Sequence, residues 1–175
     1  MAETDDKAAV LARYRNGPAV LDRALAGIGE PELDAIPAQG GWTIRKIVHH
    51  IVDGDDLWKI GLKIALGPAD GEFTLAWYGQ LSQDAWTERW AYAQRPLDGS
   101  LVLLRAIRSH VLELVEPIPE AWARAVRVRT PVGGTERVTV GDVIAMQADH
   151  VEHHAARILA LRREFAGGDE PTRNP

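Results

Sequence analysis

Apolar residues along this 175-residue chain recur mostly three and four positions apart, the spacing of one face of an α-helix. Pro18 interrupts the first such stretch and marks either a kink or the true start of a helix. Thr43 and Thr139 are placed to cap the second and the last stretch. The pattern predicts four long helices, over residues 4–28, 43–67, 100–115 and 140–165. Four such helices with one long crossover connection indicate an all-α, four-helix bundle.

Two segments depart from this spacing. Residues 68–97 are irregular and aromatic, and residues 84–93 within them fit a short helix. A connection of this length in a compact domain is usually functional. Residues 125–138 alternate apolar and polar about Gly133-Gly134, which predicts a small hairpin or extended loop before the last helix. The organisation predicts one domain over residues 1–166 and a disordered tail over 167–175.

Composition narrows the classes of function. The net charge is −5, and no basic stripe stands out, so we expect no nucleic-acid partner. No apolar run is long enough to span a bilayer, and the acidic N-terminus lacks a signal-peptide pattern, so we expect a cytoplasmic protein without a membrane partner. There is no cysteine, which excludes disulfides, thiolate ligands and a cysteine nucleophile. A metal site in this chain would use nitrogen and oxygen ligands.

Five of the six histidines fall in two short clusters, at residues 49–50 and 150–154. His150 and His154 are four residues apart and therefore share one face of a helix. His154 continues the apolar stripe of the last helix, so both rings face the interior, where uncompensated polar groups are costly. His50 lies on the core-facing side of its own helix. A cation shared by these three imidazoles would remove the cost and leave open coordination positions, as in catalytic zinc sites.

The other histidines fit this pattern less well. His49 and His153 are rotated by about 100° from their neighbours on the helix, and His110 stands alone. The plain alternative for any of the six is a histidine that is hydrogen-bonded within the fold and binds nothing. By periodicity, His50, His150 and His154 are the favoured metal ligands.

Four further residues are candidates for the site. Asp53 lies one turn after His50 and is the candidate catalytic base, with a solvated helix charge as the alternative. Trp86 and Trp90 either wall a substrate cleft or pack in the core. Arg157, one turn after His154, either binds an anionic group of the substrate or lies in solvent.

The segments 40–53 and 149–158 resemble the two metal motifs of the DinB-like superfamily, and the YfiT-type branch in particular. That branch includes bacillithiol transferases. The resemblance covers about residues 8–165, and it implies that His50, His150 and His154 are the ligands. It further implies a four-helix bundle, a Zn²⁺ or Ni²⁺ ion and a homodimer. The family often has Gln or His where this chain has Arg157, which changes the charge of the pocket and leaves the cosubstrate open.

The main hypothesis is a metal-dependent enzyme. A divalent ion on three neutral imidazoles would deprotonate a water molecule or a low-molecular-weight thiol for attack on a small electrophilic substrate. The resemblance implies either a thiol S-transferase or a hydrolase, and the absence of cysteine favours the first slightly. Two alternatives stay open: a non-enzymatic stress-response bundle that binds a metal or small molecule, and a metal-free bundle that acts through dimerisation.

Overall fold

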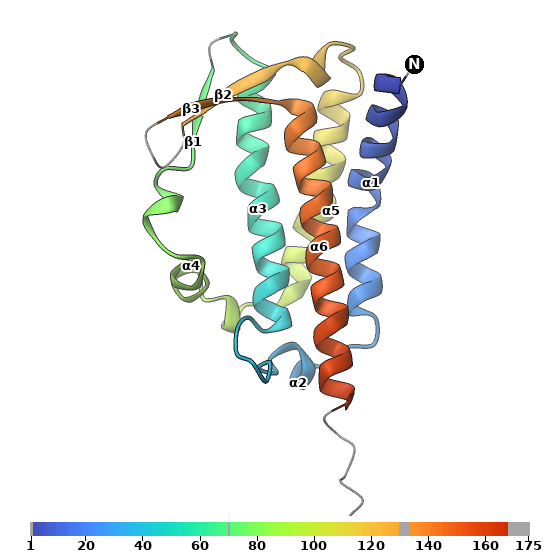
Figure 1. The fold of residues 1–175 in the computed structure, drawn as a ribbon, viewed down its shortest axis with the longest axis vertical. Helices are drawn as coiled ribbons and strands as arrows, with labels where there is room; N and C mark the ends of the chain where they lie inside the picture. The colour runs from blue at the N-terminus through green and yellow to red at the C-terminus, as the bar shows by residue number, and fades with distance from the viewer. Residues whose placement is uncertain (1, 70, 130–133, 168–175) are drawn as a thin grey trace, which may run out of the picture.

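The computed structural model describes residues 2–69, 71–129 and 134–167 (Figure 1). Its core is formed by four long helices, α1 (Ala2–Leu25), α3 (Ile44–Ala65), α5 (Leu97–Val115) and α6 (Val140–Gly167). Helix α1 packs on α5 and α6, and α3 packs on the same two helices, so α1 and α3 lie on one diagonal of the bundle. The predicted set of four long helices is confirmed.

The connection between α3 and α5 shapes one side of the molecule. Both helices run in the same direction, so the chain must return along the whole bundle, and it does so outside α3 (Figure 1). This return, residues 66–96, carries four short elements: β1 (Glu72–Thr74), η1 (Tyr78–Gln80), α4 (Gln83–Arg89) and η2 (Tyr92–Gln94). The helix predicted over 84–93 is therefore wrong at its end, because Ala91 adopts a left-handed conformation with φ 51° and stops it.

A three-stranded sheet covers one end of the bundle (Figure 1). Strands β2 (Ala125–Arg129) and β3 (Thr135–Thr139) pair antiparallel, so the predicted hairpin is confirmed. Strand β1 joins parallel to β2, with Phe73 opposite Val128, and was not predicted from its three residues. Gly133 of the predicted turn and residues 168–175 of the predicted tail lie outside the described residues, whereas Gly167 belongs to α6.

Capping accounts for where two of the long helices start. The Lys46 N–H donates to Thr43 Oγ1 at 3.3 Å, and the Asp142 N–H donates to Thr139 Oγ1 at 3.0 Å. The Asp142 carboxylate in turn accepts from the Thr139 N–H at 2.9 Å, which completes a reciprocal cap. In the described residues, no helix is long and apolar enough to cross a membrane.

Other helix boundaries differ from the prediction. Helix α1 ends at Leu25 and runs through Pro18, so Pro18 does not mark its start. Helix α5 begins at Leu97, after Pro96, three residues before the predicted Ser100. A short helix, α2 (Glu30–Leu33), follows Gly29, holds Pro31 in its first turn and was not predicted.

The buried apolar residues form two clusters, one toward each end of the bundle. The cluster nearer the sheet includes Tyr14, Leu62 and Val111, and the other includes Leu21, Ile51 and Leu104. Along all four long helices, the boundary between the clusters falls near a buried polar contact made by Arg108 of α5. We call Tyr14, Asp55, Arg108 and Gln147, which make these contacts, the ion-pair layer.

Candidate metal centre

Helices α3 and α6 bring together His50, His150 and His154, which we call the histidine cluster. Each residue offers one ligand nitrogen, and the three nitrogens lie within 4.8 Å of one another. His50 Nε2 and His150 Nε2 are 3.1 Å apart. The ring centroids are separated by 4.9 Å for His50 and His150, 5.1 Å for His50 and His154, and 4.6 Å for His150 and His154. The cluster joins residues 100 positions apart in sequence.

The donor set fits a divalent transition-metal ion. Two nitrogens bound to one zinc ion at 2.0–2.1 Å lie at most about 4.2 Å apart, and the His50–His150 pair is already inside that limit. Among the described residues, the Nδ1 atoms of His150 and His154 are buried without a hydrogen-bond partner. Imidazole nitrogens suit zinc, copper, iron and nickel, so the donor set fits a divalent transition-metal ion of this group.

The imidazoles are held in the neutral form that binds metals. Burial, together with the neighbouring histidines, lowers the pKa of His150 to about 3. Burial likewise lowers the pKa of His154 to about 4. The pKa of His50 is also lowered by burial, and the Asp53 carboxylate opposes this shift. No proton therefore has to leave these rings at neutral pH before a cation binds.

The remaining histidines have other environments. His49 is fully buried on the face of α3 that is turned toward α5, where its ring nitrogens lie 2.9 Å from Ser100 Oγ and 3.1 Å from the Arg95 carbonyl oxygen. His110 and His153 are exposed. The structure thus separates the five clustered histidines as their helical phase predicted, and it gives His49 a structural role at the start of α5.

A cavity of about 220 Å³ opens beside the histidine cluster. Helix α3 contributes four lining residues, the return connection three and α6 three: His50, Gly54, Leu57, Trp58, Leu75, Tyr78, Gln83, Met146, Gln147 and His150. The return connection therefore forms the outer wall of the site. The polar residues of the cavity besides the histidines are Tyr78, Gln83 and Gln147. Tyr78 and Gln83 were missed as site residues by the sequence analysis, because the path of residues 66–96 over α3 leaves no periodic signal, whereas Gln147 lies on α6.

Neither of the two tryptophans predicted as a cleft wall, Trp86 and Trp90, lines the cavity beside the histidine cluster. Trp86 stacks on Tyr78 with ring centroids 5.2 Å apart, and its Nε1 donates to the Tyr78 carbonyl at 2.7 Å. Tyr78, rather than Trp86, lines the cavity. Trp90 lines a neighbouring cavity of about 270 Å³ together with Asp53 and Arg95, and the two cavities share Leu57.

Asp53 and Arg157 have different positions relative to the cluster. The Asp53 carboxylate accepts from Arg95 Nη1 at 3.0 Å and lines the neighbouring cavity. Arg157 is exposed and is not among the residues that line either cavity. Trp42, just before α3, lies with its ring edge-on to His50 at 4.9 Å between centroids. It donates its Nε1 hydrogen to Asp84, which joins the return connection to the start of α3.

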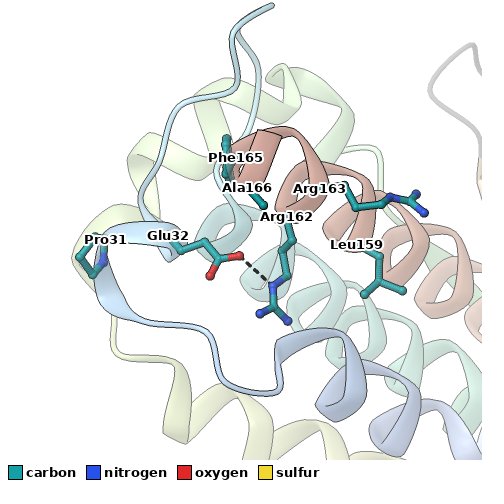
Figure 2. A pocket seen from close by; sticks show the side chains of 7 residues that line it. All are labelled: Pro31, Glu32, Leu159, Arg162, Arg163, Phe165 and Ala166. Carbon is teal, nitrogen blue, oxygen red and sulfur yellow. Dashed lines mark hydrogen bonds and ion pairs between the residues drawn. The ribbon is translucent and has the colours of Figure 1, made fainter. Parts of the chain in front are cut away.

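A larger cavity, of about 690 Å³, lies away from the histidines, between α2 and the end of α6 (Figure 2). Pro31 and Glu32 line one side, and Leu159, Arg162, Arg163, Phe165 and Ala166 line the other. Arg162 donates to Glu32 at 2.8 Å across it (Figure 2). Its lining holds no histidine and no hydroxyl nucleophile, so we do not take this cavity as the candidate metal site or active site, although it is larger.

The fold and the histidine cluster together define a four-helix-bundle protein with a candidate metal centre between two antiparallel helices. Residues 13–158 match the model of the DinB superfamily, and the chain belongs to that superfamily. The resemblance predicted from the two motifs is confirmed.

Similar proteins agree with this assignment. A Bacillus cereus protein named "Putative metal-dependent hydrolase" is 30% identical over 151 residues, covering 85% of this chain and 80% of that one. A Geobacillus kaustophilus protein of the same description is 27% identical over 154 residues, covering 87% and 82%. The solved structure of YfiT from Bacillus subtilis superposes with a TM-score of 0.77 at 24% identity, over 91% of this chain and 87% of that one, and is described as a probable metal-dependent hydrolase with an unusual four-helix bundle topology. That likeness shows the shared fold.

Proposed function

We propose that this protein is a metal-dependent hydrolase in which His50, His150 and His154 hold one zinc or nickel ion. The observation that carries the proposal is a half-buried set of three neutral imidazoles with their nitrogens within 4.8 Å of one another. The names of the relatives support the same class of activity. A divalent ion in this position supplies Lewis acidity and lowers the pKa of a coordinated water or thiol.

The chain's own residues orient the substrate. Leu57, Trp58 and Leu75 give the cavity apolar walls that displace water. The Tyr78 hydroxyl donates to Gln83 Oε1 at 2.8 Å, so the Gln83 amide nitrogen remains as a donor for a polar atom of the substrate. Trp86 and Trp90 stack behind Tyr78 and fix its ring. Asp53 acts on His50 through its charge and lines the neighbouring cavity, and its role as the base stays a prediction.

A thiol S-transferase is the second candidate, and one observation favours it. The neighbouring cavity of about 270 Å³ adjoins the first at Leu57 and holds the Arg95 guanidinium and the Trp90 ring. A two-substrate reaction needs two adjoining spaces, and a low-molecular-weight thiol with an anionic group would fit the one that contains Arg95. Arg157, being exposed, is a weaker candidate for that role.

Metal content tests the proposed centre. Protein purified without chelator is compared by elemental mass spectrometry with the His154→Ala variant and with His110→Ala, a matched control at an exposed histidine. We expect close to one equivalent of zinc or nickel in the wild type and in His110→Ala, and little in His154→Ala. Equal trace metal in all three proteins would contradict the proposal.

The loaded protein then separates the two reactions. Activated esters and amides are screened alone for hydrolysis, and an electrophilic fluorophore is screened with glutathione, mycothiol and bacillithiol for thiol conjugation. Turnover without thiol supports the hydrolase, and turnover that requires thiol supports the transferase. A metal-loaded protein inactive across both panels would favour the non-enzymatic binding bundle. The homodimer and the cytoplasmic location stay predictions.

A further inference from the structure

A buried ion pair crosses the bundle next to the histidine cluster. Arg108 is 1% exposed and Asp55 is 2% exposed. Arg108 Nε donates to Asp55 Oδ2 at 2.7 Å, and Arg108 Nη2 donates to Asp55 Oδ1 at 3.3 Å. Burial raises the pKa of the Asp55 carboxyl, and the Arg108 guanidinium opposes that rise. Replacing such a pair by apolar residues often leaves a protein as stable or more so, so stability alone is a weak reason for its presence.

The guanidinium also bonds to the two other long helices. Arg108 Nη1 donates to the Tyr14 carbonyl of α1 at 2.8 Å, and Nη2 donates to the Gln147 carbonyl of α6 at 2.8 Å. Its plane lies over the Tyr14 ring, 4.4 Å from the centroid. One side chain on α5 thus fixes the positions of α1, α3 and α6 relative to one another.

Helix α1 is adapted to receive this side chain. Pro18 has no N–H, so the carbonyl of Tyr14, four residues earlier, lacks its helical donor, and Arg108 supplies one. A Cβ on Gly17 would lie 1.9 Å from Arg108 Nη1, so only glycine leaves room there. Glycine and proline both have low helix propensity. At positions 17 and 18 they make the space and the free carbonyl that the Arg108 guanidinium occupies and binds.

The contacts on α3 and α6 adjoin the histidine cluster. Gly54, which precedes Asp55, packs against the His150 ring, because a Cβ placed there would lie 3.4 Å from His150 Cε1. Gln147 is one turn before His150, and its Nε2 donates to the Gly54 carbonyl at 3.4 Å. Arg108 therefore joins α3 to α6 at the level where the His150 ring rests on α3.

We propose that the Asp55–Arg108 pair is a positioning device that holds α3 and α6 at the separation the histidine cluster requires, so that the three imidazoles are assembled before a metal ion binds. Its importance to the activity rests on the proposed function. The assembly of the imidazoles in the metal-free protein does not, and it can be measured separately.

The test replaces both charged residues at once. The double variant Asp55→Leu/Arg108→Met removes the pair without leaving an unpaired buried charge, and Leu62→Ala is the matched control, a buried truncation on α3 in the cluster near the sheet. The first readout is the nuclear Overhauser contact between the ring protons of His50 and His150 in metal-free protein. The second is the affinity for Zn²⁺, measured by competition with a chromophoric chelator.

We expect the wild type and Leu62→Ala to show the ring contact and to bind Zn²⁺ with affinities within about threefold of each other, since the control leaves the cluster untouched. We expect the double variant to fold, to lose the ring contact and to bind Zn²⁺ roughly tenfold or more weakly, the scale of losing a group that orients metal ligands. A double variant that keeps both the contact and the affinity would overturn the proposal, as would a metal-free wild type without the contact.

Should the double variant fail to fold, Arg108→Lys replaces it. One ammonium keeps the positive charge beside Asp55 but cannot reach the Tyr14 and Gln147 carbonyls as well. We then expect the same loss of the ring contact, and retention of the contact in Arg108→Lys would overturn the proposal. If the wild type binds no metal, the proposed function fails, and the ring contact still decides the positioning role.

Discussion

The ion-pair layer and the histidine cluster are two buried polar regions of one bundle, about one helical turn apart, and they differ in how their polar atoms are satisfied. In the ion-pair layer, Arg108 makes four hydrogen bonds, and the protein supplies every partner. In the histidine cluster, the buried Nδ1 atoms of His150 and His154 have no partner among the described residues. Buried polar groups are almost always paired in folded proteins.

The difference indicates what each region is for. The hydrogen bonds of the Asp55–Arg108 pair close within the chain and hold the helices together, so this pair is the closed region. Gln147 Oε1, also in the layer, is by contrast buried without a partner among the described residues, and Gln147 lines the cavity beside the histidines. The histidine cluster leaves two buried ring nitrogens, Nδ1 of His150 and Nδ1 of His154, without a partner among the described residues, so it is the open region, where we propose that an ion binds. The bundle places the closed region directly beside the open one.

Single substitutions in the ion-pair layer sharpen the contrast most. Asp55→Leu leaves the Arg108 charge buried and unpaired, so we expect a loss of about 3–5 kcal/mol in the free energy of unfolding. The double variant Asp55→Leu/Arg108→Met leaves mainly the Tyr14 carbonyl without a donor, so we expect a smaller loss of about 1–3 kcal/mol. Urea unfolding of both variants measures the difference. If Asp55→Leu were no less stable than the double variant, the Arg108 charge would not be buried and dependent on Asp55 as described.

Metal binding should stabilise only the open region. With free Zn²⁺ at one hundred times its Kd, we expect the free energy of unfolding to rise by about 2.7 kcal/mol. The gain should disappear in His154→Ala and persist in His153→Ala, which changes the exposed neighbour. Thermal unfolding with and without Zn²⁺ measures it, and an equal gain in both variants would place the ion elsewhere.

Two glycine substitutions compare a tight position with an open one. Gly17→Ala puts a methyl group against Arg108, and we expect overpacking to cost about 1–3 kcal/mol. Gly99→Ala, in α5 with nothing within 4 Å of its Cβ position, should instead stabilise by up to about 1 kcal/mol. Chemical denaturation of the two variants checks the opposite signs. If Gly17→Ala proved stabilising, Arg108 would have room to move.

The smallest expected effect is at the start of α6, which carries two of the histidines. Hydrogen bonds from Thr139 lower the pKa of Asp142 in the folded state. The Asp142 carboxylate therefore adds to the free energy of unfolding at a pH above its unfolded pKa, and this stabilisation is lost as the pH falls through its folded pKa. We expect Asp142→Ala to cost about 1 kcal/mol near neutral pH and much less at about pH 2.5. Urea titrations at the two pH values provide the measurement, and a cost independent of pH would contradict it.

Much of the candidate site followed from the sequence because it depends on local spacing. Residues four apart on a helix share a face, so His150 and His154 must lie together. His50 comes three residues after Ile47 and therefore shares its core-facing side of α3. Thr43 and Thr139 cap their helices as predicted, since capping acts within three residues.

The features that escaped prediction depend on contacts between distant segments. Tyr78 and Gln83 reach the cavity only because the return connection runs over α3, and β1 finds its partner about 55 positions away. Arg108 lies four residues from both Leu104 and Leu112, on the buried stripe of α5, which was an available signal. Pro18 was recognised as a flaw in its helix, but its reason lies in Arg108, some 90 residues later.

The separation of the histidines along the chain has a consequence for folding. A cation that joins His50 to His150 closes a loop of 100 residues, so it removes chain entropy from any partly unfolded form that still holds it. Such a link acts on the unfolded ensemble as a disulfide would, in a chain that contains no cysteine. Unlike a disulfide, it is reversible and responds to the free metal concentration rather than to the redox state of the surroundings.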